Sequence, residues 1–233
     1  MKPTIISIRR RRFLRSAMIA TPGVAATLLI NPAVARADNA TASSAPYAPQ
    51  YFSTTEFGTL NALADRLIPA DQHGPSASEA GVIEFLDRQM QTPYGRGELW
   101  YMDGPHDPSA SGLFGYQLKY PPSELYRIAL REFAAEVNHR YSKAFIELTS
   151  AEQDKIVALL EKDDFSMSTV PAIVFFSQLL ANVHEGYFCD PIHGGNKQMA
   201  AWKMIGFPGA RADYMDWVNQ YGERYPLPPI SLA

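Results

Sequence analysis

Apolar side chains recur three and four residues apart in several segments of the chain, and this spacing constrains the fold more than any other feature. A helix places such residues on one face, whereas a half-buried strand would need alternation at every second residue. We find no convincing run with a period of two. The sequence therefore predicts an all-α protein, a single irregular helical domain of about six to seven helices with long loops.

The spacing also predicts where the helices lie. We expect a first helix capped at Ser53, helices over 77–90, 121–147 and 151–161, a strongly apolar and central helix from Pro171 through Val183, a short helix around Trp202, and a last helix through Tyr214, Trp217, Val218 and Tyr221. Residues 91–120 contain too many glycines and prolines for a regular element. A loop of this length is usually functional or covers another part of the protein.

The charge of the chain is unevenly distributed. Residues 1–37 carry seven of the 21 basic residues and none of the 24 acidic ones, so 14 basic residues face 24 acidic ones in the remainder, a net charge of −10. A surface that binds phosphate groups needs clustered lysines and arginines. The body of the protein is therefore not expected to bind nucleic acid or anionic lipid.

The N-terminal segment has the features of an export signal. Consecutive arginines, among them Arg10 and Arg11, precede Phe13 and Leu14, and a short apolar stretch leads to a cleavage site after Ala37. The apolar stretch is shorter than the roughly 20 residues that a spanning helix needs, which disfavours a membrane anchor. We expect a twin-arginine signal peptide over 1–37, a flexible linker over 38–52 and the helical domain over 53–233.

The candidate chemistry is sparse. Cys189 is the single cysteine, and a buried free thiol is favoured over a reactive or disulfide-bonded one. His184 and Glu185 are neighbours in sequence, so on a helix they point in different directions, whereas a zinc-binding His-Glu-x-x-His motif needs ligands four residues apart. We therefore predict no catalytic, metal-binding or cofactor-binding residue on this chain.

Several residues nevertheless suggest a contact surface for another protein. The aromatic side chains of the loop at 94–120 favour either a small satellite core or an interface, because tyrosine and tryptophan are enriched in protein interfaces. The predicted contact residues are Tyr187, Asp190, Gly194, Gly195, Asn196, Trp202 and Trp100.

Together these residues resemble the gluconate 2-dehydrogenase subunit 3 family, also called the gamma or small subunit. The resemblance spans nearly all of residues 53–209. It is carried by Thr55, Leu67-Ile68-Pro69-Ala70-Asp71, Ala80-Gly81-Val82, Phe85-Leu86-Asp87, Phe175-Phe176, Glu185-Gly186-Tyr187-Phe188-x-Asp190-Pro191-x-x-Gly194-Gly195-Asn196, Trp202 and Ile205-Gly206-Phe207-Pro208-Gly209. The chain has His193 where members often have tyrosine, a departure that touches no assigned role.

The resemblance implies a small subunit that accompanies a large FAD-containing dehydrogenase subunit and a multihaem cytochrome c subunit. It implies a role in maturation, twin-arginine export and stability of the flavoprotein, at a periplasmic location where the complex associates with the cytoplasmic membrane. FAD and haem c would belong to the partners. Related small subunits serve 2-ketogluconate, sorbitol, fructose and glucose dehydrogenases, so the substrate stays open.

Two further classes of function remain as alternatives. An independent exported metal-dependent enzyme would use His184, Glu185 or Asp190 and would bind its metal or cofactor on the isolated chain. An exported small-molecule binding module would be stable alone and further stabilised by its ligand.

Overall fold

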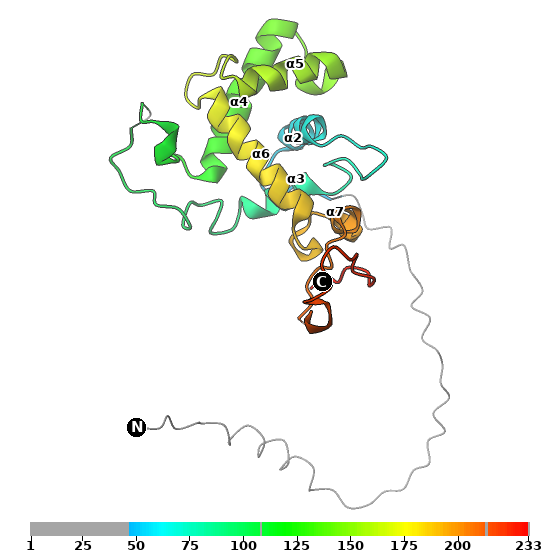
Figure 1. Cartoon of the computed structure of the whole chain (residues 1–233). Coiled ribbons are helices and arrows are strands. Elements are labelled where there is room, and N and C mark those ends of the chain that lie inside the picture. Colours follow the sequence, from blue (N-terminus) through cyan, green and yellow to red (C-terminus); the bar gives the residue numbers. More distant parts are fainter. Residues whose placement is uncertain (1–46, 108, 213, 233) are drawn as a thin grey trace, which may run out of the picture. The chain divides into compact units, whose positions relative to one another are not determined.

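The computed structural model describes residues 47–107, 109–212 and 214–232. This part of the chain is helical, and it contains no named strand. Its helices are α2 (Thr54–Leu67), α3 (Val82–Gln89), α4 (Pro122–Tyr141), α5 (Ser150–Glu161), α6 (Ala172–Phe188) and α7 (Ala200–Ile205) (Figure 1). The prediction of an all-α fold is confirmed for these residues. The predicted signal peptide, with Arg10, Arg11, Phe13, Leu14 and the cleavage site at Ala37, lies outside them.

Helix α6 lies at the centre of the domain, as its apolar sequence predicts. It packs against α2, α3, α4, α5 and α7 (Figure 1). Four of its apolar side chains are buried at helical spacing, namely Phe175, Phe176, Leu179 and Val183. A helix that is apolar over more than one face is stable only when neighbours cover it on several sides. The other helices provide this cover.

The cap at Ser53 forms as the sequence predicts, and α5 begins with a cap of the same kind. The Ser53 hydroxyl accepts a hydrogen bond from the Glu56 amide, and the Glu56 carboxylate accepts one from the Ser53 amide. Thr149 and Glu152 form the same reciprocal pair at the start of α5. Such a box satisfies amide groups that have no partner within the helix, and it stabilises the helix start.

Two predicted helices are shorter than their apolar patterns suggest. The helix predicted over 77–90 begins only at Val82, because Gly81 takes a left-handed conformation with φ 77°. The helix predicted to reach 147 ends at Tyr141, where Ser142 is left-handed with φ 54°. The apolar spacing of 121–147 places Phe145 on the buried face of that predicted helix, but in the structure Phe145 is buried within the separate 3₁₀ turn Phe145–Glu147. Spacing therefore predicted its burial correctly and its element wrongly.

The prediction of a last helix through Tyr214, Trp217, Val218 and Tyr221 is wrong. Among the described residues after Gly209, 210–212 and 214–232, the one helical element is the 3₁₀ turn Met215–Trp217. The exposed fractions of Val218 and Tyr221 are 55% and 87%, so the apolar stripe of this segment has no core to cover. An isolated short helix without tertiary packing is not stable in water, which explains the difference.

The described chain is attached to the domain before α2 begins. The buried carboxylate of Asp87 on α3 accepts hydrogen bonds from the Tyr47 hydroxyl and from the amides of Gln50, Tyr51 and Phe52, at 2.7–3.0 Å. Burial and the hydrogen bond to Asp87 raise the pKa of Tyr47 to about 12. The end of the predicted linker, residues 47–52, is therefore bound to the helical domain.

The long connection between α3 and α4 carries little regular structure, as predicted. Outside residue 108, which the structure does not describe, its one helical element is the 3₁₀ turn Gly112–Phe114. The connection returns to its start, because the Ser123 amide donates a hydrogen bond to the Gly95 carbonyl at 3.0 Å. In the described part of the chain, no helix has the length and apolar character that crossing a membrane requires.

Candidate functional site

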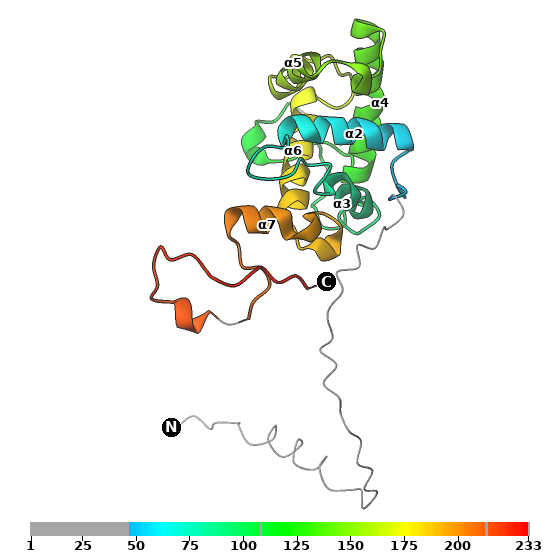
Figure 2. The same cartoon turned by 90° about the vertical axis from the view of Figure 1, so that its right-hand side faces the viewer.

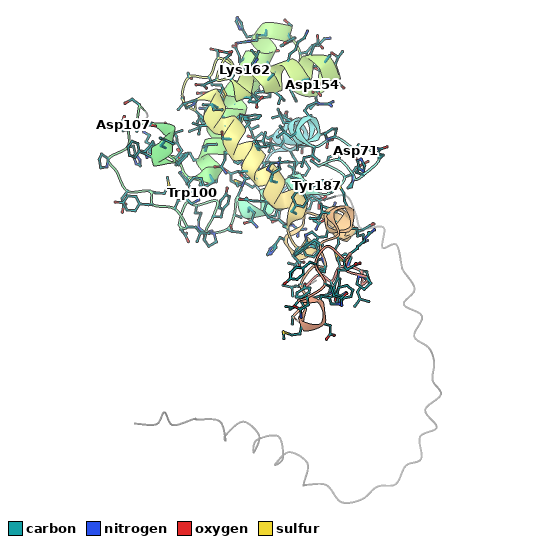
Figure 3. All side chains as sticks on the ribbon, in the orientation of Figure 1. Asp71, Trp100, Asp107, Asp154, Lys162 and Tyr187 are labelled. Carbon is teal, nitrogen blue, oxygen red and sulfur yellow. The ribbon has the colours of Figure 1, made fainter. Side chains whose placement is uncertain are left out.

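Six of the seven predicted contact residues lie where α6 ends and α7 begins. We call residues 186–202 the α6–α7 junction. Two 3₁₀ turns, Pro191–His193 and Lys197–Met199, connect the two helices within it. The seventh residue, Trp100, lies apart from Tyr187 in the loop after α3 (Figure 3). Its ring packs against the rings of Tyr94 and Tyr116, so it belongs to the aromatic cluster of that loop.

Asn196 connects the two helices of the junction. Its side chain is fully buried, and its backbone is left-handed with φ 45°. The amide nitrogen Nδ2 donates a hydrogen bond to the Cys189 carbonyl at 2.9 Å, and Oδ1 accepts one from the Ala201 amide at 2.9 Å. One side chain therefore satisfies a carbonyl that follows α6 and an amide that begins α7. A buried amide with both ends satisfied specifies one geometry.

Trp202 and Tyr187 form hydrogen bonds that connect the junction to the end of α6 and to the loop before α3. The Trp202 indole donates a hydrogen bond from Nε1 to the Phe188 carbonyl at 2.8 Å. The Tyr187 hydroxyl donates to the Pro75 carbonyl at 2.8 Å and thereby fixes the loop before α3. Burial raises the pKa of Tyr187, so the hydroxyl keeps the proton that it donates.

The glycine pair allows the turn to lie directly against α6. A Cβ atom added to Gly195 would lie 2.1 Å from the Gly186 carbonyl oxygen and 2.9 Å from the Cys189 sulfur. The backbone of α6 therefore occupies the space beside this turn that a side chain at position 195 would need. The close approach is the physical reason for glycine at this position.

Asp190 connects the junction to the C-terminal end of the chain. Its carboxylate accepts hydrogen bonds from the Ile192 amide at 3.1 Å, the Ser231 hydroxyl at 2.5 Å and the Leu232 amide at 2.9 Å. Burial alone would raise the pKa of Asp190, but these hydrogen bonds outweigh it and the pKa is lowered. The carboxylate therefore stays ionised while it holds the last described residues.

The candidate metal ligands come only partly together: Glu185 and His193 line one shallow hollow with Cys189, whereas His184 does not line it. His184, Glu185 and His193 are exposed, and Glu185 accepts a hydrogen bond from Asn182 at 2.8 Å. Across residues 47–107, 109–212 and 214–232, no group of three histidine, cysteine, aspartate or glutamate residues could hold a metal ion. Cys189 is partly buried, burial raises the pKa of its thiol, and the thiol donates to the Gly186 carbonyl at 3.3 Å.

A second polar cluster lies in the middle of α6, and the sequence analysis missed it. Asn182 is 1% exposed and accepts hydrogen bonds from the Tyr126 hydroxyl at 2.9 Å and from Gln178 at 2.8 Å. Gln178 and Asn182 both donate to the Tyr94 hydroxyl at 2.7 Å. Two amide residues four apart on an otherwise apolar helix could have indicated it. The cluster ties α4 and the loop after α3 to the central helix.

Two hollows lie outside the junction core. A groove of about 740 Å³ lies between residues 117–120 and 163–172, and none of the predicted contact residues lines it. A second hollow, of about 490 Å³, lies between the ring of Trp202 and residues 224–229 of the C-terminal segment. The second hollow places the C-terminal segment beside the junction.

The junction combines buried polar contacts with exposed apolar side chains. Its buried polar atoms bond to other parts of the same chain, while Phe188 and Ile192 remain 40% and 50% exposed on its surface. The predicted contact residues Gly194, Gly195 and Asn196 are buried, and Tyr187 and Trp202 nearly so. Their contact with a partner stays a prediction. In the structure these buried residues hold the exposed side chains of Phe188 and Ile192 in position.

Comparison with known families explains why these residues occur together. The family model for gluconate 2-dehydrogenase subunit 3 matches residues 54–209, which include α2 to α7 and the whole junction. The chain belongs to the gluconate 2-dehydrogenase subunit 3 family. It is therefore a subunit of a multisubunit dehydrogenase complex. Comparisons with curated proteins and with solved structures gave no match.

Proposed function

We propose that this chain is the small, non-catalytic subunit of a periplasmic gluconate 2-dehydrogenase complex. Its role is to assist the maturation, export and stability of a large FAD-containing subunit. The observation that carries the proposal is the family match over residues 54–209. The junction lies within the matched range and supports the proposal, because its buried polar groups bond within the chain and leave Phe188 and Ile192 exposed for a partner.

The chemistry of the complex belongs to its partners in this proposal. Oxidation of the C2 hydroxyl of D-gluconate to a ketone releases two electrons and two protons, which FAD on the large subunit accepts. A multihaem cytochrome c subunit then passes the electrons to the quinone pool. The large subunit sets the substrate, so a related sugar or sugar-acid dehydrogenase is the alternative complex.

Export forms the second part of the proposal. Arg10, Arg11, Phe13 and Leu14 would address the chain to the twin-arginine translocase, which carries folded proteins. A large subunit that folds around FAD in the cytoplasm could then cross the membrane bound to this chain. The mature complex would associate with the cytoplasmic membrane from the periplasmic side.

Affinity purification of the tagged chain from its native periplasm and membranes tests the proposal. We expect co-purified FAD and haem c, seen in the absorbance spectrum, and dye-linked oxidation of gluconate. A colourless chain without a partner would contradict the subunit role. Metal or cofactor on the isolated chain would instead support the independent enzyme.

A matched pair of leader variants tests the export role. Changing both Arg10 and Arg11 to lysine should move dehydrogenase activity out of the periplasmic fraction, because the translocase reads the arginine pair. Arg36→Lys, next to the cleavage site, preserves the charge and should leave export unchanged. Equal periplasmic activity in both variants would contradict twin-arginine export.

A further inference from the structure

The described chain begins with a short segment that is bound to the domain before the first helix starts. We call residues 47–52 the N-terminal strap, and Figure 2 shows it beside α3 at the start of α2. The buried carboxylate of Asp87 holds the strap with both of its oxygens. Oδ2 accepts hydrogen bonds from the Tyr47 hydroxyl and the Gln50 amide, and Oδ1 accepts them from the amides of residues 51 and 52.

Two arginines on different helices also hold the strap. The Arg88 guanidinium of α3 lies over the Tyr47 ring, 5.4 Å from its centroid. The Arg127 guanidinium of α4 lies over the Tyr51 ring at 4.3 Å and donates to the Tyr51 carbonyl. The last strap residue, Phe52, is 3% exposed and packs in the core. Because these contacts come from α3, α4 and the core, the strap can form only on the folded domain.

The strap sets how much chain separates the leader from the folded domain. Cleavage is expected after Ala37, so the nine residues 38–46 lie between the cleavage site and the strap. Fully extended, nine residues span at most about 30 Å. A released strap would add the six residues 47–52, which span at most about 20 Å more. The contacts of Asp87 therefore determine the reach of the chain at the cleavage site.

Removal of a leader is a proteolytic step, and a protease needs backbone that it can bind in an extended form. Hydrolysis adds one water molecule across the Ala37–Asp38 peptide bond and leaves a carboxylate on Ala37 and an amino group on Asp38. Backbone that is bonded within a folded domain opens rarely and resists cleavage, whereas exposed terminal segments are cleaved readily. A folded domain held too close to this bond would keep a peptidase away from it.

We propose that Asp87 anchors the strap so that residues 38–46 form a spacer of fixed length, and that removal of the leader depends on this length. This inference rests on the proposed function, which supplies the leader and its export. The twin-arginine route carries folded proteins, so the strap is already in place when the peptidase meets the chain. The chain that the peptidase can draw into its active site then ends at Tyr47.

The test compares three variants of the full chain with the wild type, each expressed together with the large subunit. The first lacks residues 40–46 and so keeps two residues after the cleavage site. The second, the matched control for length, carries seven glycine and serine residues in their place. The third combines the deletion with Tyr47→Phe and Gln50→Pro, which removes both donors to Asp87 Oδ2. The readout is the mass of the chain in the periplasmic fraction, which distinguishes precursor from mature protein.

We expect the deletion variant to reach the periplasmic side as uncleaved precursor, because the folded domain then begins directly after the cleavage site. The length control should be cleaved as the wild type is, and the variant with the loosened strap should recover part of the cleavage. Normal cleavage of the deletion variant, an equal loss in the length control, or a deletion precursor confined to the cytoplasm would overturn the inference. Each of these results leaves the proposed function intact.

Limited proteolysis of the mature chain, purified with its bound partners, tests the anchor without export. A protease of broad specificity should trim the wild type as far as residue 46 and stop at Tyr47. Tyr47→Phe with Gln50→Pro should be trimmed further toward Ser53, while survival of the remaining chain shows that the domain is folded. Tyr47→Phe alone, which keeps three of the four hydrogen bonds, replaces the double variant if that variant does not fold.

Trimming of the wild type through the strap, or an unchanged end point in a folded strap variant, would overturn the inference. If the wild-type chain is not exported, or keeps its leader in the periplasm, the export part of the proposed function fails, and the spacer role fails with it.

Discussion

The backbone of Gly195 lies so close to α6 that a Cβ atom there would be 2.1 Å from the Gly186 carbonyl oxygen. This contact brings the turn between α6 and α7 against the end of the central helix. It also means that the buried side chain of Asn196 reaches the Cys189 carbonyl and the Ala201 amide from a single position. The close approach of Gly195 to Gly186 therefore positions the turn and the Asn196 side chain that connects the two helices.

Replacing Gly195 by alanine should destabilise the domain by roughly 3 kcal/mol, because the new methyl group meets backbone that cannot move aside. The matched control is Gly58→Ala in α2, where a Cβ atom would meet nothing within 4 Å. That change should stabilise the domain by about 1 kcal/mol, since alanine has the higher helix propensity. Urea unfolding of both variants measures the free energies, and equal stability of the two would contradict the close approach.

Replacing Asn196 by alanine should cost about 2–4 kcal/mol of unfolding free energy, because a buried carbonyl and a buried amide both lose their partner. Asn196→Gly removes the same hydrogen bonds but accepts the left-handed backbone, so it should be about 1 kcal/mol less damaging. Thermal or urea unfolding of the two variants separates the side-chain effect from the backbone effect. Alanine and glycine variants of identical stability would show that the left-handed conformation carries no strain.

The sequence predicts the helices best where a cap and a core face agree. Ser53 with Glu56, and Thr149 with Glu152, mark helix starts that the structure confirms. The pattern through Tyr214 to Tyr221 has the spacing of a helix but no core to pack against, and there the prediction is wrong. Spacing reports which residues would share a face, whereas tertiary packing decides whether a helix forms.

The polar contacts of the site are harder to predict than the helices. The block from Glu185 to Asn196 is recognisable in sequence, but its burial and its hydrogen bonds depend on α7 and the loop before α3. Asp87 shows the same limit, because its four donors come from residues 35–40 positions earlier in the chain. Spacing and caps are local, so neither signals a bond that joins two distant segments.

Changing Asp87 to asparagine should destabilise the domain by about 3 kcal/mol, because an amide group would direct hydrogen atoms at donors that need an acceptor. The matched control is Asp154→Asn, which removes an ion pair with Arg66 whose aspartate side chain is 56% exposed. The Arg66 side chain is 23% exposed, so solvent still reaches the pair, which should contribute about 1 kcal/mol. Chemical denaturation gives both values. A loss at Asp87 as small as at Asp154 would show that residues 47–52 are held by other contacts.

Glu132 should make the stability of the domain depend on pH in the acidic range. Its carboxylate on α4 accepts hydrogen bonds from Ser168, Thr169 and Val170, in the segment that leads into α6. Burial alone would raise the pKa of Glu132, but these hydrogen bonds outweigh it and lower the pKa from 4.5 to about 2. The ionised form is therefore the one that the folded state favours.

The sign of the effect follows from the lowered pKa. The folded state binds the proton of Glu132 less readily than the unfolded state, so this stabilisation is fully present above pH 4.5 and is lost as the pH falls toward 2. Glu132→Gln has no carboxylate to protonate there. We expect the difference in unfolding free energy between the wild type and this variant, measured by urea denaturation from pH 6 to pH 2, to shrink as the pH falls. A difference that stays constant over this range would show that the Glu132 carboxylate is not held by the segment before α6.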